Sequence, residues 1–184
     1  MKRDELEHVI RAAAAIANES DIVVIGSQAI LGQFPNAPEV LLFSQEADVY
    51  PREQPEKAVA IDGVMGDGSQ FHDTFGYYAH GVGPETPRAP AGWQQRLIAV
   101  HVPLISGQDS QATGWCMEAH DLVLAKLAAA RERDIDFAEE AVRHGLVQPE
   151  ELLRRVPDLP VDEGHQALVR SLVQSIVDKT TRQA

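Results

Sequence analysis

The pattern of hydrophobic and polar positions changes along the chain, from short strand-like runs between helices to helices alone. Apolar residues recur with helical spacing over 4–19, and four β-branched residues follow at 22–25. Strands or strand pairs are predicted at 22–25, 40–50, 76–82 and 96–102. The last of these alternates only loosely, so we expect it to be covered on both faces.

Proline, glycine and polar residues mark the remaining elements. Further helices are predicted from about 28, at 55–65, and then at 121–132, 134–144, 149–155 and 162–180. Residues 106–114 are predicted to be a polar loop, and His72 is assigned to the loop before the strand at 76–82. The stretch 63–69 is interpreted as a helix end and a turn, because it lacks the Gly-Lys-Ser/Thr ending of a phosphate-binding loop.

This order of elements predicts two regions. An α/β region covers 1–120, and a helical region over 121–184 is expected to pack on it. The 184 residues suit one domain, or a compact domain with a helical appendage, and 44% of them are hydrophobic, which is enough for a substantial core.

The single cysteine and the absence of a long apolar run indicate the compartment. Cys116 excludes an intramolecular disulfide, and its apolar neighbours predict a buried structural thiol rather than a nucleophile. No apolar run approaches the ~20 residues that span a bilayer, and the charged first residues do not resemble a signal peptide. We therefore expect a cytoplasmic protein.

The net charge of −12 argues against broad, nonspecific nucleic-acid binding, which depends on Lys and Arg neutralising phosphates. Residues 1–120 hold 7 basic and 16 acidic residues, a net −9, whereas 121–184 hold 9 and 12, a net −3. A contact with a polyanion is therefore expected in the second region, around Lys126, Arg131, Arg133 and Arg143.

The apolar run at 22–25 stops at Gly26 and Ser27 and gives way to helical residues. Such a turn leaves backbone N–H groups unpaired at a helix N-terminus, where phosphate binds readily. The alternative is an ordinary strand-to-helix turn in which Ser27 is the N-cap.

The next predicted strand carries two acids one residue apart, Glu46 and Asp48. On a strand, residues i and i+2 point to the same face, about 6–7 Å apart. The pair would converge on one divalent cation, or on two cations about 4 Å apart. The alternative is a solvent-facing pair at a strand end, whose like charges repel. Combined with the turn at Gly26, the pair predicts phosphoryl or nucleotidyl transfer.

These motifs resemble the signature of the nucleotidyltransferase superfamily, in which a Gly-Ser turn precedes acid-x-acid on the next strand. The segment 120–134 resembles the helical segment of abortive-infection (AbiEii-like) toxin nucleotidyltransferases, which carry a Lys, then an Arg, then an Asp. The chain also resembles an uncharacterised bacterial nucleotidyltransferase-like family (DUF6036-like) that shares Glu-x-Asp-Val-Tyr-Pro and the stretch 71–82. The resemblance implies an α+β fold, with a small mixed sheet and helices on one face, followed by a C-terminal helical bundle.

The same resemblance implies an activity, the transfer of NMP from an NTP to a hydroxyl of an RNA end or a protein, in a toxin–antitoxin-like setting. Asp48 and Lys126 would be the catalytic residues. The residues implied for nucleotide binding are Gly26, Ser27, Lys126 and Arg131, and those implied for Mg²⁺ are Glu46 and Asp48.

Three features depart from the family pattern. The first acid is Glu46, where Asp is commoner. Eighteen residues lie between Ser27 and Glu46, where typical members have fewer. A third carboxylate usually lies on the next strand, but His80 is found there, and a neutral imidazole is a poor ligand for Mg²⁺. The alternative function is therefore a catalytically impaired nucleotide-binding or regulatory module of the same fold.

The helical region offers its own alternatives. Lys126 interrupts an otherwise apolar helix, so an inward-leaning side chain needs an anionic partner, which favours a role near phosphate. For Arg131 the alternative is solvated helix charge paired with Asp134. Asp121 is predicted to be a helix N-cap rather than a catalytic acid. A zinc site is a further alternative, although no two of its histidines have the i, i+4 spacing: His72, His80, His101 and His120.

Overall fold

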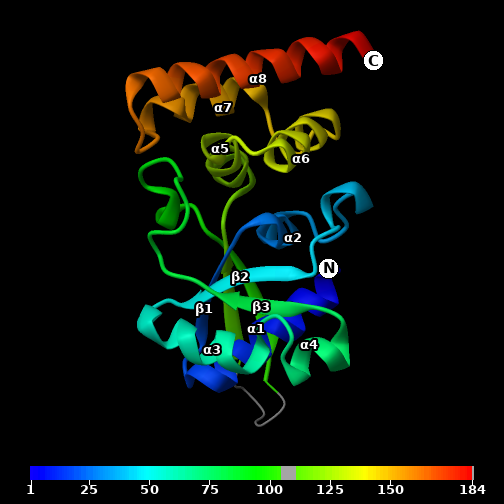
Figure 1. Ribbon diagram of the computed structural model, residues 1–184, viewed down its shortest axis with the longest axis vertical. Coiled ribbons are helices and arrows are strands. Elements are labelled where there is room, and N and C mark those ends of the chain that lie inside the picture. The colour runs from blue at the N-terminus through cyan, green and yellow to red at the C-terminus, as the bar shows by residue number, and fades with distance from the viewer. Residues whose placement is uncertain (105–110, 184) are drawn as a thin grey trace. The chain divides into compact units, whose positions relative to one another are not determined.

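The computed structural model describes residues 1–104 and 111–183, which form helices and a five-stranded sheet (Figure 1). The architecture is the α+β fold that the sequence predicted. The chain divides into two compact units, and their residues are Met1–Thr86 with Leu97–Met117, and Pro87–Arg96 with Glu118–Ala184. The predicted boundary at residue 120 and the packing of the helical region on the α/β region stay predictions.

The first unit contains the whole sheet and four helices. Its α-helices are α1 (Arg3–Ala17), α2 (Ile30–Gln33), α3 (Ala58–Met65) and α4 (Gln70–Phe75). Its strands are β1 (Asp21–Ile25), β2 (Glu46–Pro51), β3 (Tyr78–Gly81), β4 (Ile98–Pro103) and β5 (Gln111–Cys116). Short 3-10 helices cover Ser27–Ala29, Glu39–Leu41 and Pro55–Lys57.

The strands pair in the order β3-β2-β1-β5-β4 and form a mixed sheet. β1 is antiparallel to β2, with Ile25 opposite Asp48, and parallel to β5. β2 is parallel to β3, so Asp48 also lies opposite His80, and the two strands run side by side in Figure 1. The pair of β4 and β5 is antiparallel.

Helices α1 and α3 pack on one face of this sheet. Buried side chains alternate with more exposed ones in the first half of β2 and in β3, where Ala47, Val49 and Ala79 are inaccessible to solvent. Gly81 lies so close to α3 that a Cβ atom there would be 2.0 Å from the carbonyl oxygen of Ala58. Because successive side chains on a strand point to opposite faces, the intervening residues of β2 and β3 share the other face.

Strand β5 was not predicted, because residues 106–114 were assigned to a polar loop. Residues 111–116 form this strand between β1 and β4, whereas residues 105–110 lie outside the described part of the chain. Its small residues are explained by α1, since a Cβ atom on Gly114 would lie 2.3 Å from Cδ1 of the buried Ile10. Because α1 packs so closely, β5 has small residues in place of the bulky ones by which strands are recognised in a sequence.

Three other predictions need correction. The strand predicted over 40–50 begins only at Glu46. The segment assigned to a loop around His72 forms α4, which begins after Ser69, whose hydroxyl accepts the His72 backbone N–H. The strand at 96–102 is not covered on both faces, because β4 is an edge strand in which exposed and buried residues alternate from Ala99 onwards.

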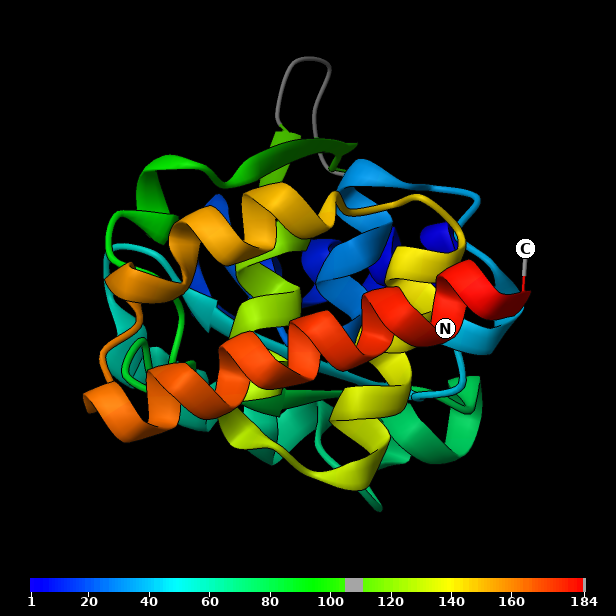
Figure 2. The same cartoon turned by 90° about the horizontal axis from the view of Figure 1, so that it is seen from above.

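The second unit is helical, as predicted. Its α-helices are α5 (Ala119–Ala129), α6 (Glu132–Arg143), α7 (Pro149–Arg155) and α8 (Glu163–Gln183), with short 3-10 helices at Trp93–Gln95 and Val156–Asp158. In Figure 2, α8 (orange to red) crosses the view beside α6 (yellow) and α7 (orange), which it contacts. No described helix has both the length and the apolar character required to cross a membrane.

Helix α5 begins with a buried network of charges rather than with the predicted cap. Glu118 is the N-cap, and its carboxylate accepts the backbone N–H groups of His120 and Asp121. Asp121 is fully buried and binds the guanidinium groups of Arg96 (2.7 Å) and Arg155 (2.9 Å). The prediction of Asp121 as the cap was therefore wrong, because the residue that precedes the helix provides the capping oxygen.

The packing of Gly114 against Ile10 predicts the effect of a larger side chain. Gly114→Val should destabilise the protein by about 1–3 kcal/mol through overpacking, although valine favours strands. Thermal and urea unfolding would measure this change. Gly63→Ala is the control, because a Cβ atom at this helical position meets nothing within 4 Å. Equal stability of the two variants would contradict the proposed packing.

The Glu118 network predicts acid sensitivity. Burial alone would raise the pKa of Glu118, but hydrogen bonds and charges from His120 and Arg155 lower it to about 2. The stabilisation is therefore complete above the ordinary carboxyl pKa near 4.5 and is lost as the pH falls towards 2. Glu118→Gln should cost about 2–4 kcal/mol at neutral pH.

The difference between wild type and Glu118→Gln should shrink between pH 5 and pH 2. Thermal midpoints measured across this range test the prediction, with the exposed Glu150→Gln in α7 as the control. A difference that stays constant with pH would refute it.

Candidate metal and nucleotide site

Pairing of three strands brings the predicted site residues of the first unit to one position on the sheet. β1 ends at Ile25, so Gly26 and Ser27 leave the sheet beside Asp48, the cross-strand partner of Ile25. Asp48 in turn pairs with His80 on β3. The Gly-Ser turn, the acid pair and the histidine of the third strand therefore lie next to one another.

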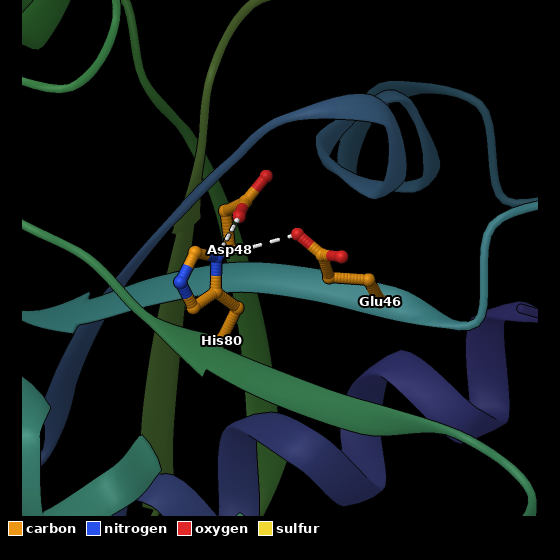
Figure 3. A group of neighbouring side chains, drawn as sticks. All are labelled: Glu46, Asp48 and His80. Carbon is orange, nitrogen blue, oxygen red and sulfur yellow. Dashed lines mark hydrogen bonds and ion pairs between the residues drawn. The ribbon is translucent and has the colours of Figure 1, made fainter. Parts of the chain in front are cut away.

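Glu46, Asp48 and His80 point toward a common centre (Figure 3). Nδ1 of His80 lies 3.0 Å from Oδ1 of Asp48 and 3.3 Å from Oε1 of Glu46. One potential ligand atom from each residue lies within 4.8 Å of those of the other two. Within the described residues, this is the group whose spacing would suit a single metal ion.

The two carboxylates strongly influence each other. Burial and then the neighbouring Glu46 raise the pKa of Asp48 to about 6, although His80 opposes this shift. Burial would also raise the pKa of Glu46, but hydrogen bonds from Tyr78 and Asp48 and the charge of His80 lower it overall. Burial would lower the pKa of His80, but its hydrogen bond with Asp48 and the charges of Asp48 and Glu46 raise it overall. The centre therefore favours a positive charge between the two acids.

Tyr78 holds one side of the Glu46 carboxylate. Its hydroxyl donates a hydrogen bond to Oε2 of Glu46 at 2.8 Å, while Oε1 faces His80. Burial and this hydrogen bond raise the pKa of Tyr78 to about 12, so the hydroxyl remains a donor at neutral pH. No local pattern indicated this role, because it depends on Tyr78 lying opposite Glu46 in the β2–β3 pair.

The turn after β1 approaches Asp48 closely. Gly26 has φ +70°, and a Cβ atom there would lie 2.1 Å from Oδ2 of Asp48. Glycine is therefore required both by the backbone conformation and by the carboxylate. Ser27 begins the 3-10 helix that follows and is half-buried, and the buried Gln28 donates to the carbonyl oxygen of Ser44 before β2.

A cavity of about 330 Å³ adjoins this centre. Its lining residues come from β2, β3 and the end of α3, and they are Glu46, Asp62, Gly66, Asp67, Tyr78 and His80. Asp62 is held in place by the backbone N–H of Gly81, which it accepts at 3.2 Å. Asp62 and Asp67 were not predicted as site residues, since only the packing of α3 on β3 brings them to the acid pair.

The comparison with family models identifies the group to which the protein belongs. The model described as "Nucleotidyltransferase of unknown function (DUF6036)" matches residues 4–170. The chain belongs to this family. The searches of curated proteins and of solved structures gave no match. The resemblance to the uncharacterised nucleotidyltransferase-like family is thereby confirmed. The likeness to AbiEii-like toxins still rests on the sequence of residues 120–134.

In the second unit, Lys126 and Arg131 both contact one carboxylate, that of Asp134. Nζ of Lys126 lies 3.0 Å from Oδ1 of Asp134, and Nε of Arg131 lies 2.6 Å from Oδ2. Lys126 is largely buried above the ring of Phe137, and burial lowers its pKa. The anionic partner of Lys126 is thus Asp134, and Arg131 forms the pair with Asp134 that was its alternative interpretation. The role of both residues in nucleotide binding stays a prediction.

The zinc alternative is not supported by the positions of its histidines. His72 contacts Asp67, His101 contacts Thr113, and only His80 belongs to the three-residue centre. His120 contacts Glu118. Cys116 is fully buried, and burial raises the pKa of its thiol to about 12, so the prediction of a structural thiol is confirmed.

The donor set fits a single divalent cation. Two half-buried carboxylates each direct one oxygen toward the centre, and their mutual repulsion is relieved by a positive charge between them. Carboxylate oxygens suit hard divalent ions, and the imidazole nitrogen adds a ligand that such ions use less often.

Gly26→Ala tests whether the turn positions Asp48. The new methyl group would displace the carboxylate, so we expect divalent-cation affinity to fall at least about tenfold, with a loss of stability of about 1–3 kcal/mol. Isothermal titration with Mn²⁺ and thermal unfolding measure the two effects.

Gly68→Ala is the matched control. Gly68 also has positive φ, but a Cβ atom there meets nothing within 4 Å. This variant should lose stability and retain metal affinity. If Gly26→Ala bound the ion as tightly as Gly68→Ala, the turn would have no part in forming the centre.

Proposed function

We propose that the protein is a Mg²⁺-dependent nucleotidyltransferase, which transfers NMP from an NTP to a hydroxyl acceptor. The observation that carries the proposal is the convergence of Glu46 and Asp48 beside the Gly26 turn, in a member of a nucleotidyltransferase family. Phosphoryl transfer is catalysed mainly by positioning and by neutralising negative charge, and this arrangement of residues suits both tasks.

The roles of the first-unit residues follow from their chemistry. Glu46 and Asp48 would hold the divalent cation through the oxygens that face His80. A bound divalent cation neutralises charge on phosphate oxygens and aligns the reacting groups. Backbone N–H groups of the turn after β1, with the Ser27 hydroxyl, would donate hydrogen bonds to the β- and γ-phosphates.

The cations of the second unit are proposed to bind the triphosphate. Lys126 and Arg131 carry two positive charges and share the single negative charge of Asp134, which leaves the group at +1. Arg131 keeps more than half of its side chain exposed, so it remains accessible to a phosphate. This charge would stabilise the leaving pyrophosphate.

The acceptor is proposed to be a hydroxyl of an RNA end or of a protein side chain. The acidic cavity beside the centre and the net charge of −12 disfavour an extended nucleic-acid contact. An acceptor that presents one hydroxyl, with little phosphate around it, is compatible with these charges.

A nucleotide-binding module without catalysis is the second candidate. It is favoured by His80, which occupies the position opposite Asp48 where the superfamily resemblance leads us to expect a third carboxylate. Such a module would bind NTP without transferring NMP. The two candidates therefore differ in product formation rather than in binding.

An assay of NMP transfer by the wild type separates the two candidates, and Asp48→Asn tests the proposed centre. The substitution keeps the size of the side chain and removes its charge, so we expect NMP transfer to fall at least about 100-fold with little change in folding. The assay uses each α-³²P-labelled NTP with total RNA or total protein and added Mg²⁺ or Mn²⁺. Labelled product identifies the acceptor class.

Asp73→Asn is the control, because Asp73 is an exposed residue of α4 that does not line the cavity. It should retain wild-type transfer. Transfer that survives Asp48→Asn would refute the proposed centre, and NTP binding without transfer by the wild type would establish the module instead.

A further inference from the structure

His80 is the feature of the centre that a magnesium site does not explain. We propose that Glu46, Asp48 and His80 form a mixed oxygen–nitrogen site that selects a first-row transition-metal ion, represented by Mn²⁺, over Mg²⁺. The inference rests on the metal site of the proposed function and replaces Mg²⁺ with Mn²⁺ as the ion that this site binds more tightly.

The imidazole nitrogen lies where an ion between the two acids would reach it. The same atom, Nδ1 of His80, is 3.0 Å from Asp48 and 3.3 Å from Glu46, so a cation bound to both carboxylates would also lie beside this nitrogen (Figure 3). The parallel pairing of β2 with β3 places His80 directly opposite Asp48. The ring therefore reaches the centre because of the fold and not through a flexible loop.

The oxygens available to a cation are limited by their other contacts. Oε2 of Glu46 accepts the Tyr78 hydroxyl at 2.8 Å, which leaves Oε1 for the centre. Oδ2 of Asp48 lies against Gly26, which leaves Oδ1. Glu46 and Asp48 thus offer one oxygen each to a cation, and His80 offers one nitrogen.

This donor set discriminates between ions. Mg²⁺ requires nearly octahedral oxygen coordination and rarely accepts imidazole, whereas the later divalent ions accept nitrogen increasingly well. Mn²⁺ shares the suitability of Mg²⁺ for carboxylate oxygen. As a transition-metal ion it also accepts an imidazole nitrogen, so it gains a third protein ligand where Mg²⁺ gains two. A carboxylate in place of His80 would remove this difference.

The test is metal binding without nucleotide, so that it does not depend on transfer activity. Calorimetric titration of the full-length protein with Mn²⁺ and with Mg²⁺ gives the ratio of their dissociation constants. We expect the wild type to bind Mn²⁺ at least about tenfold more tightly than Mg²⁺. In His80→Asp this preference should fall at least about fivefold, because both ions then meet three carboxylates.

Two further variants test whether the change in the Mn²⁺/Mg²⁺ preference is specific to the loss of the His80 imidazole. His101→Asp introduces the same charge at an exposed histidine of β4 that contacts Thr113, and it should leave the ratio unchanged. His80→Asn keeps the side chain neutral and should also lower the preference. Circular dichroism confirms folding, and the ratio cancels any general effect of added charge on affinity.

Pulsed electron paramagnetic resonance of bound Mn²⁺ detects a nitrogen ligand directly. A ¹⁴N coupling in the wild type and in His101→Asp that is lost in both His80 variants would establish the site. An unchanged ratio in both His80 variants, or no ¹⁴N coupling in the wild type, would overturn the selection by His80 while leaving the carboxylate centre intact. Failure of the wild type to bind either ion would overturn this inference together with the metal site.

Discussion

The candidate site depends on the register in which three strands pair. Ile25 lies opposite Asp48, and Asp48 lies opposite His80, so the end of one strand, an acid and a histidine come together on the sheet. A shift of one residue in either pair would turn the side chains of a strand to the other face. This register is maintained on the face of the sheet that α1 and α3 cover, because Ala47, Val49 and Ala79 are fully buried there. Core packing on one face therefore positions the chemistry on the other.

The same register imposes an electrostatic cost. Two carboxylates on one strand face are held close together and partly removed from water, which raises the pKa of Asp48 to about 6. His80 compensates for part of this repulsion, and a divalent cation would compensate more completely. The fold therefore holds an unfavourable arrangement of charges at the proposed metal site. Such local strain is common at functional sites.

Much of the fold was predictable because its signals are local. Helical spacing located α1 and the C-terminal helices, and the apolar run at 22–25 with its Gly-Ser ending located β1 and the turn. The acid pair was recognisable because alternation on a strand is a property of the strand itself. The positions of His80 and Asp48 on adjacent strands were anticipated only through the family resemblance.

The features that were missed depend on contacts between distant residues. β5 appears polar and contains Gly114, whose small size is explained only by the approach of Ile10. The capping oxygen of α5 comes from Glu118, while Asp121, the apparent cap, is buried between two arginines. Asp62 reaches the cavity because α3 packs on β3, which no local pattern indicates.

The most direct measurement is anomalous diffraction from crystals of the protein grown or soaked with Mn²⁺. We predict one strong anomalous peak within about 2.5 Å of Oε1 of Glu46, Oδ1 of Asp48 and Nδ1 of His80. A peak at another acidic surface, with these three side chains still bound to one another, would contradict the assignment of the centre.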